Sequence, residues 1–274
     1  MQTRRAIFIE TLLFLLLLFA PLTACNSAPP PPITVHLTLI GEDSMQWIAQ
    51  ALSKTYSNMR PNIAFTLQTA NPENALRAPG EDSRTIGMVA RAIKPNELYR
   101  DRAQVIALDG VAVIVNQKNP INAIQRSQIT QVFSGQIAAW PTGPNIGKPI
   151  VVVSREEGSG TRDAFETMAM GDQRVTYTSV IMPGEAAVVD YVAQHPDAIG
   201  YASMGALTPD VRALAIDDIP PSPQSVESKK YPFVRTLAFV IPDDANPDLI
   251  DFVKFALGSE GQALIGQRFG RAPQ

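Results

Sequence analysis

Hydrophobic positions along this chain follow two periods, and stretches of the two kinds alternate. Short apolar runs have the length and composition of buried strands, whereas other stretches repeat apolar residues at every third or fourth position, as on one face of a helix. The predicted strands are 33–40, 63–68, 85–89, 105–108, 111–115, 150–153, 199–202 and 236–241. The predicted helices are 45–56, 127–133, 186–194, 247–255 and 260–269, and a further helix begins at Thr161.

This alternation predicts an α/β protein with mainly parallel sheets. Asp109-Gly110, which lies between two of the apolar runs, is a typical turn signal and predicts a turn at that point. The chain of 274 residues is longer than a single hydrophobic core comfortably fills, so we expect two domains. No internal repeat is visible in the sequence.

The segment 154–165, S-R-E-E-G-S-G-T-R-D-A-F, follows a predicted strand and combines a glycine-flanked hydroxyl turn with the start of a helix. Ser159 and Thr161 each offer a hydroxyl and a backbone N–H, and the glycines beside Ser159 let the backbone approach a ligand. The helix start adds unpaired N–H donors, and Arg155 adds a planar charged group. The pattern predicts an oxyanion site, although an ordinary helix cap has the same residue types.

Several function classes are disfavoured. A Walker A loop requires Gly-Lys-Ser/Thr, and a serine-hydrolase elbow requires glycine where Glu157 stands. His36 and His195 are the only histidines, and with a single cysteine they provide no zinc-binding spacing. The formal net charge of −3 argues against a nucleic-acid surface. We therefore expect no enzyme, no metal, no cofactor and no nucleic-acid partner.

The first 24 residues have the pattern of a secretory leader. Arg4 and Arg5 precede the apolar stretch 12–19, and Leu22-Thr23-Ala24 leads to Cys25, the only cysteine in the chain. This resembles the lipobox of bacterial lipoproteins, which implies cleavage before Cys25 and a diacylglyceryl group on its sulfur. An uncleaved transmembrane helix is the alternative, but the apolar stretch is shorter than the about 20 residues that a span requires. Residues 27–32 end in four prolines and predict an extended tether.

Five sequence blocks occur in order along the rest of the chain. They are the run from D-G-V-A-V-I-V-N to Q-I-A-A-W at 109–140, R-E-E-G-S-G-T-R-D-A-F at 155–165, H-P-D-A-I-G-Y-A-S at 195–203, Y-P-F-V-R-T-L at 231–237 and F-V-K-F-A-L-G-S-E-G-Q at 252–262. Together they resemble the phosphate-binding protein of bacterial phosphate ABC importers. The resemblance implies a type II periplasmic-binding-protein fold, in which two α/β lobes, each a mainly parallel sheet flanked by helices, close on one oxyanion. The implied lobes are 33–112 plus 238–274 and 113–237.

The resemblance also implies a set of ligand-binding residues. They are Ser44, the backbone N–H of Met45, Arg91, Arg155, Ser159, Gly160 and Thr161. One departure from the family pattern is that Asn71-Pro72-Glu73-Asn74 replaces a Gly/Ser-rich loop after the strand 63–68, so a usual serine donor is missing.

A second departure concerns the proton that phosphate carries near neutral pH. Arg91 stands where some relatives have an aspartate that accepts this proton, and its alternative role is an ion pair between the lobes. The acceptor must then come from elsewhere. Asp43, Glu156 and Glu185 are the candidates, and each of them is equally compatible with a solvated surface acid.

We therefore expect a monomeric, lipid-anchored extracytoplasmic receptor that captures inorganic phosphate and delivers it to an ABC permease in the membrane. Two alternatives remain open. One is a receptor for another tetrahedral oxyanion, such as sulfate or molybdate. The other is a sensor or assembly lipoprotein that no longer binds phosphate, which the missing Gly/Ser-rich loop motivates.

The lipid anchor can be tested at a single atom. Cys25→Ser removes the only thiol in the chain, so the variant should leave the membrane fraction while its circular dichroism spectrum stays that of the wild type. Two acyl chains on one residue are sufficient for stable anchoring. Mass spectrometry that finds unmodified Cys25 in the membrane fraction of the wild type would contradict the assignment.

Overall fold

The computed structural model describes residues 34–97, 100–141 and 145–273. Thr34–Gln274 forms one compact unit, and every described element and core residue lies in it. The leader, the lipid attachment at Cys25 and the proline tether are predictions that fall outside the described residues. No helix within the described ranges is long and apolar enough to cross a bilayer.

The predicted strands and helices are present with ends at or within a few residues of the expected ones, except that the predicted strands 105–108 and 111–115 form one continuous strand. The strands are β1 (Val35–Gly41), β2 (Ile63–Thr69), β3 (Thr85–Val89), β4 (Ala103–Asn116), β5 (Ala123–Ile124), β6 (Val151–Arg155), β7 (Val180–Met182), β8 (Ala198–Ser203), β9 (Val211–Ala213), β10 (Ala215–Ile216), β11 (Val234–Val240) and β12 (Gly270–Arg271). The helices are α2 (Gln46–Met59), α3 (Pro72–Arg77), α4 (Arg126–Phe133), α5 (Gly160–Phe165), α6 (Glu185–Gln194), α7 (Pro223–Glu227), α8 (Pro247–Leu257) and α9 (Ser259–Ile265).

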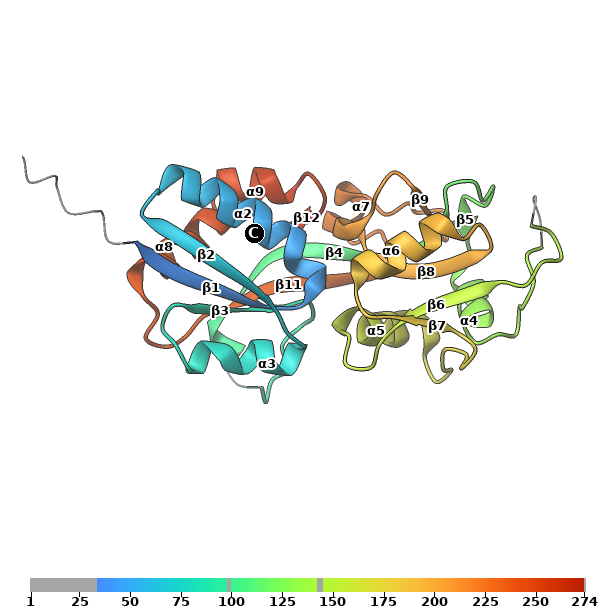
Figure 1. The fold of residues 1–274 in the computed structure, drawn as a ribbon, viewed down its shortest axis with the longest axis horizontal. Coiled ribbons are helices and arrows are strands. Elements are labelled where there is room, and N and C mark those ends of the chain that lie inside the picture. The colour runs from blue at the N-terminus through green and yellow to red at the C-terminus, as the bar shows by residue number, and fades with distance from the viewer. Residues whose placement is uncertain (1–33, 98–99, 142–144, 274) are drawn as a thin grey trace, which may run out of the picture. The chain divides into compact units, whose positions relative to one another are not determined.

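The main sheet has the strand order β2-β1-β3-β11-β4-β8-β6-β7, and β9 and β12 also pair with β4. Strand β1 pairs in parallel with β2 and β3, and β6 pairs in parallel with β7 and β8. We call the part with β1, β2 and β3 the first half and the part with β6, β7 and β8 the second half. Strands β4 and β11 run between the halves and pair antiparallel with each other (Figure 1). The predicted α/β fold with mainly parallel sheets is confirmed.

The predicted turn at Asp109-Gly110 was wrong, because both residues lie inside the continuous strand β4. The strand changes partner here: it pairs with β11 as far as Gly110 and with β8 from Val111 on. The Asp109 carboxylate is fully buried and accepts a hydrogen bond from Arg235 Nε at 2.9 Å, so it needs no solvent. A Cβ atom on Gly110 would lie 3.0 Å from Val226, which explains the glycine.

Aromatic packing in the second half fixes the start of α5 against the sheet. Phe165 of α5 stacks on Tyr201 of β8, with ring centroids 4.0 Å apart and an interplanar angle of 6°. The Tyr201 hydroxyl lies 2.8 Å from Ser154 Oγ and accepts the backbone N–H of Arg155 at 3.3 Å. Since all of these groups are buried, the end of β6 and the helix that follows it hold one relative position.

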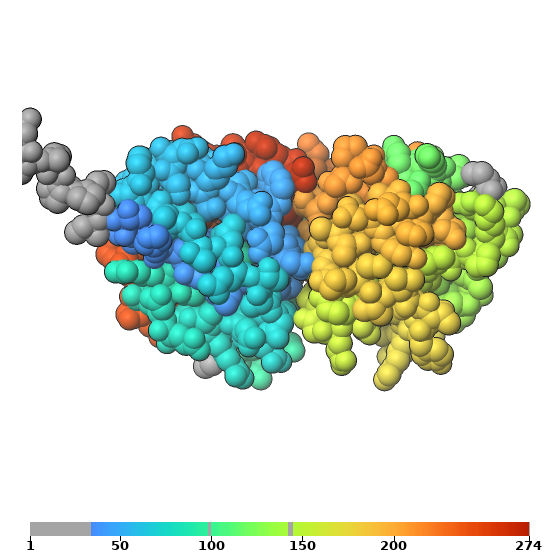
Figure 2. Space-filling view, in the orientation of Figure 1, coloured from blue at the N-terminus to red at the C-terminus, as the bar shows by residue number. Residues whose placement is uncertain are grey.

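The two halves meet along a narrow seam on the face shown in Figure 2, where blue residues of the first half touch yellow residues of the second. The segment after β1, which includes a short turn of 3-10 helix at Asp43–Met45, reaches this seam. The residues that the sequence singles out as chemical candidates follow β1, β3 and β6, so they gather here.

Candidate functional site

The carboxyl ends of parallel strands from both halves face each other at the seam. Glu42 and Asp43 follow β1, Arg91 follows β3, and Arg155 is the last residue of β6. In open α/β sheets, ligands bind at such strand ends, because the loops there converge. The fold therefore brings the first-half and second-half candidates together, as the sequence predicts, but it also gives most of them partners within the chain.

Arg155 is 2% exposed and is surrounded by carboxylates. Its Nη1 donates to Glu185 Oε1 at 2.7 Å, and its Nε and Nη2 each donate to Glu156 at 2.8 Å. Its Nη2 also donates to Asp43 Oδ1 at 3.3 Å. These carboxylates are the three that the sequence offers as acceptors for a ligand proton. All three are instead partners of the predicted anion-binding arginine.

Glu185 takes two of the donors predicted for a dissolved anion. Its Oε1 accepts hydrogen bonds from the Thr161 hydroxyl and from Arg155, and its Oε2 accepts the backbone N–H of Ser203 at 2.8 Å. Burial raises the pKa of Glu185, as does the charge of Asp43, while Arg155 opposes the shift. With both oxygens bound, this carboxylate stands where an anion held by Arg155 and Thr161 would stand.

Glu42 has a different environment, and the sequence analysis did not identify it. Its side chain is buried, and Oε1 accepts the backbone N–H of Ala90 at 2.7 Å. Its Oε2 has no hydrogen-bond donor among the described residues. A Cβ atom on Gly160 would lie 1.6 Å from Oε2, so the carboxylate rests directly on this glycine. Burial raises the pKa of Glu42, and the charge of Arg235 only partly offsets this.

Arg235 of β11 supplies the complementary group. Its Nε and Nη2 lie 2.9 and 2.8 Å from Asp109 Oδ2, and Ser203 Oγ donates to the other Asp109 oxygen at 2.9 Å. The guanidinium is buried, and Nη2 is engaged by the Asp109 carboxylate, whereas Nη1 has no partner in the part of the chain that the structure describes. The charge is paired, but N–H groups remain for a ligand.

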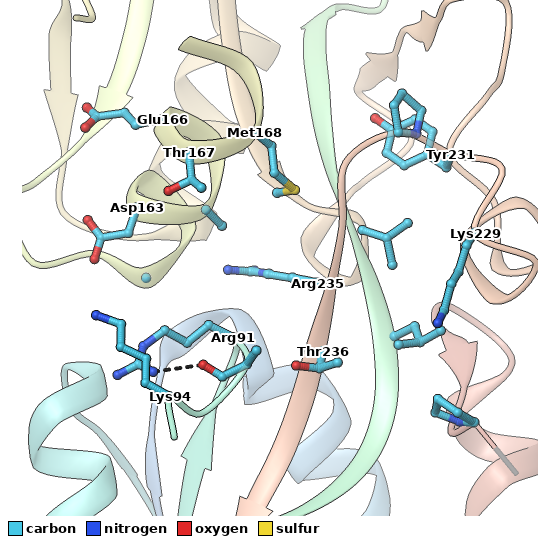
Figure 3. A pocket seen from close by; sticks show the side chains of 17 residues that line it. Arg91, Lys94, Asp163, Glu166, Thr167, Met168, Lys229, Tyr231, Arg235 and Thr236 are labelled. Carbon is cyan, nitrogen blue, oxygen red and sulfur yellow. Dashed lines mark hydrogen bonds between the residues drawn. The ribbon is translucent and has the colours of Figure 1, made fainter. Parts of the chain in front are cut away.

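The Arg235 side chain extends from β11 into a cavity of about 1000 Å³ between the halves (Figure 3). Arg91 and Lys94 lie on one side of this cavity, Asp163 on the other, and Gly160 is part of its wall. A smaller cavity of about 390 Å³ lies on the other side of Glu42 and also includes Gly160. Gly160 thus contacts Glu42 Oε2 and also lines the cavity that Arg235 enters.

The other residues predicted from the sequence have mixed surroundings. Ser44 is buried, and its Oγ has no partner within the described residues. The Met45 N–H donates to the Glu42 carbonyl at 3.0 Å and is therefore occupied. Arg91 donates to both oxygens of Glu97, at 2.7 and 2.8 Å, within the first half and not across to the second. Ser159 caps α5 by accepting the N–H of Arg162 at 3.3 Å.

The segment that replaces the expected Gly/Ser-rich loop begins helix α3. Asn71 Oδ1 accepts the N–H of Asn74 at 2.9 Å, and Pro72 occupies the first position of the helix, where no N–H is needed. Asn71 and Pro72 line the smaller cavity. Their side chains are therefore explained by helix capping, and the segment does not restore the missing serine donor.

Sequence reasoning missed Glu42, Asp109, Ser203 and Arg235. A usable signal existed for two of them, because Asp109 and Arg235 are charged residues inside otherwise apolar strand patterns, where a charge requires a buried partner. Glu42 follows an ordinary strand end and gives no such signal. No cluster of His, Cys, Asp and Glu within the described ranges is arranged to hold a metal ion.

Comparison with known proteins shows the family to which this chain belongs. A model of the PBP superfamily domain matches residues 26–260, and the chain belongs to this superfamily of binding proteins. The phosphate-binding protein PstS of Pseudomonas aeruginosa is 26% identical over 265 residues, which cover 85% of this chain and 81% of the relative. PstS of Bacillus subtilis is 27% identical over 200 residues, covering 72% of this chain and 66% of the relative.

A solved structure from Clostridium perfringens, described as a phosphate ABC transporter substrate-binding protein with bound phosphate, has a TM-score of 0.80 to this chain. It is 27% identical and covers 87% of this chain and 100% of its own. The predicted type II periplasmic-binding-protein fold is confirmed. These relatives are binding proteins and not enzymes, which confirms the prediction that the chain is not an enzyme.

Removing the Thr161 hydroxyl should destabilise the protein even when no anion is present. Thr161→Val keeps the shape of the side chain but withdraws a donor from the buried Glu185 carboxylate, at a cost of about 1 to 3 kcal/mol in the free energy of unfolding. Thr161→Ser keeps the hydroxyl and is the matched control. Thermal unfolding in anion-free buffer checks this, and a serine variant less stable than the valine variant would contradict it.

Glu42→Gln should stabilise the protein at neutral pH but not in acid. Because burial raises the pKa of Glu42, the folded chain keeps this proton to a higher pH than the unfolded chain, whose carboxyl titrates near 4.5. The free energy of unfolding of the wild type therefore falls as pH rises from 4.5 through the raised pKa. Glutamine avoids this loss, so the gain in melting temperature should grow from about pH 4 to about pH 8.

Glu97→Gln provides a control of opposite sign. Hydrogen bonds from Arg91 lower the pKa of Glu97 to about 2, so its ionised form stabilises the folded chain above the ordinary value of 4.5. That contribution is lost as pH falls toward 2. This variant should melt below the wild type at neutral pH and approach it in acid. Melting curves that shift in the same direction for both variants would contradict the two assignments.

Proposed function

We propose that this protein is the solute receptor of an ABC importer and that it captures inorganic phosphate between its two halves. The halves act as the lobes 33–112 plus 238–274 and 113–237, joined by β4 and β11. One observation carries the proposal: Arg235 Nη1 and Glu42 Oε2 are buried without partners in the described part of the chain, Glu42 Oε2 rests on Gly160, and Gly160 lines the same cavity as Arg235. Donors and an acceptor at one place fit an oxyanion that carries a proton.

The balance of buried charge supports a protonated ligand. Three carboxylates, those of Glu42, Asp109 and Glu185, and two guanidinium groups, those of Arg155 and Arg235, are at least nine-tenths buried. Ionised Glu42 would leave one negative charge in excess, which is costly in a buried site. Phosphate and Glu42 can share one proton, whichever of them holds it. Sulfate brings no proton at neutral pH, so it fits the site only while Glu42 itself is protonated, whereas phosphate fits either protonation state of Glu42.

The predicted site residues take direct and indirect roles in this proposal. The Ser44 hydroxyl, which lacks a partner within the described ranges, is a free donor from the first lobe, and Ser159 and Gly160 shape the wall of the second. Arg155 and Thr161 hold Glu185 in place and meet the ligand only where it displaces that carboxylate. Arg91 forms the cavity wall.

Location and partners follow from the sequence pattern and the relatives. A lipid group on Cys25 would hold the receptor at the outer face of the membrane, where a permease can accept the ligand. The name of the Pseudomonas aeruginosa relative and the bound phosphate in the Clostridium perfringens structure support phosphate as the ligand. We expect the receptor to work as a monomer, since the ligand lies between two halves of one chain.

A second function is favoured by a specific observation. Glu185 and Asp43 already satisfy Arg155, and Glu185 also takes the Thr161 hydroxyl. A sensor or assembly lipoprotein that has lost phosphate binding would keep the fold and fill its old anion site with such carboxylates. Sulfate or molybdate in place of phosphate is the remaining variant of the receptor function.

Calorimetric titration of residues 27–274 with phosphate, sulfate and molybdate decides among these functions. We expect heat from phosphate only. Arg235→Lys keeps the charge beside Asp109 but removes the free guanidinium N–H groups, so phosphate affinity should fall about tenfold to a hundredfold for loss of a charged hydrogen bond of about 1.5 to 3 kcal/mol. The control is Lys94→Gln, which alters an exposed cation of the same cavity.

Each result has one interpretation. Equal heats from phosphate and sulfate would contradict the proposal that Glu42 makes the site selective for phosphate. A flat trace with all three anions would favour the sensor. An unchanged phosphate affinity in Arg235→Lys would show that Arg235 of β11 does not bind the ligand.

A further inference from the structure

Asp43 belongs to the first half of the molecule but is bound by the second. Its Oδ2 accepts the backbone N–H of Glu185 at 2.8 Å, and its Oδ1 accepts a hydrogen bond from Arg155 Nη2 at 3.3 Å. A Cβ atom on Gly184 would lie 3.2 Å from Oδ2, so the carboxylate fits closely against the start of α6. This contact joins residues that are 142 positions apart in the chain.

Helix α6 needs such a partner. It has ten residues, and Gly184, which precedes it, has no side chain that could cap the free N–H groups of the first turn. The second half therefore presents a helix start without a side-chain cap beside a buried guanidinium, and this combination attracts an anion. The anion that fills the position is the Asp43 carboxylate of the other half.

The neighbouring residue repeats the arrangement. Glu42 also projects from the first half, and its Oε2 rests on Gly160 at the start of α5 in the second half. Two successive carboxylates on the segment after β1 thus both contact the second half. A dissolved oxyanion bound between two lobes would also contact both sides of the seam, as these two carboxylates do.

We infer that Asp43 is a tethered counterpart of the ligand: its carboxylate binds the anion position of the second half and keeps the two halves closed when no dissolved anion is present. This inference does not depend on phosphate being the ligand. Because the carboxylate is attached to the chain, its effective concentration at this position is about millimolar or higher, so it competes with free anions there. The Arg235 cavity stays available to a ligand while the halves are closed.

The size of the effect follows from the groups involved. A hydrogen bond to a charged acceptor contributes about 1.5 to 3 kcal/mol, so losing even one of the two that Asp43 accepts should shift the ratio of closed to open molecules at least about tenfold to a hundredfold toward open. Arg155 remains paired with Glu156 and Glu185 in that case, so its charge does not become unpaired.

Distances between spin labels on the two halves test the inference directly. Residues 27–274 contain no cysteine, so Lys54→Cys on α2 and Asp190→Cys on α6 place one label on an exposed position of each half. In anion-free buffer we expect one short distance for the wild-type site, unchanged by millimolar phosphate. Asp43→Ala should give a longer and broader distribution, and millimolar phosphate or sulfate should restore the short distance.

The control is Glu157→Ala, which removes an exposed acid from the same smaller cavity and should leave the distance short. If the alanine variant no longer unfolds cooperatively, Asp43→Asn replaces it in the distance measurement, because asparagine removes the charge at constant size. A long distance in the unliganded wild type, a short distance in the Asp43 variants, opening in the control, or no recovery with either anion would each overturn the inference. The distance in the unliganded wild type is measured without any anion, so it tests the inference separately from the calorimetric outcome for phosphate.

Discussion

The ion pair between Asp109 and Arg235 is the interaction on which the arrangement of this molecule depends. Both groups are buried on adjacent strands that connect the two halves, and either charge alone would cost several kcal/mol. Asp109 also accepts the hydroxyl of Ser203, whose backbone N–H donates to Glu185. One polar network therefore runs from the connecting strands to the seam, and the charges at the site cannot be rearranged independently of the strands between the halves.

Most of the fold could be predicted from the sequence, because the strands and helices follow from the local spacing of hydrophobic residues. The strand 85–89 has the predicted bounds, and α6 begins one residue before its prediction. The turn predicted at Asp109-Gly110 was wrong for a physical reason: a polar dipeptide indicates a turn only if solvent satisfies it, and here Arg235, 126 residues away, satisfies the carboxylate. The residue pattern around a position does not show partners that are distant in the sequence.

The same limit applies to the candidate site. The sequence singled out the loops after β1, β3 and β6, and the structure brings these strand ends of both halves together. The sequence could not show that Glu185 would accept the hydrogen bonds of Arg155 and Thr161. Glu185 is 24 to 30 residues away from these donors, and the segments meet only after folding. Glu42 escaped notice because a carboxylate after a strand end is usually solvated, and only the burial of this one makes it chemically significant.

The contact between Glu42 and Gly160 also constrains how this protein can change over generations. Any side chain at position 160 would overlap the Glu42 carboxylate, with its first carbon 1.6 Å from Oε2. A larger residue at 160 therefore requires the flexible end of Glu42 to move away from Gly160, or a smaller residue at position 42. Through this one van der Waals contact, a change of residue at position 160 also changes the placement of the Glu42 carboxylate, so the two positions are expected to change together.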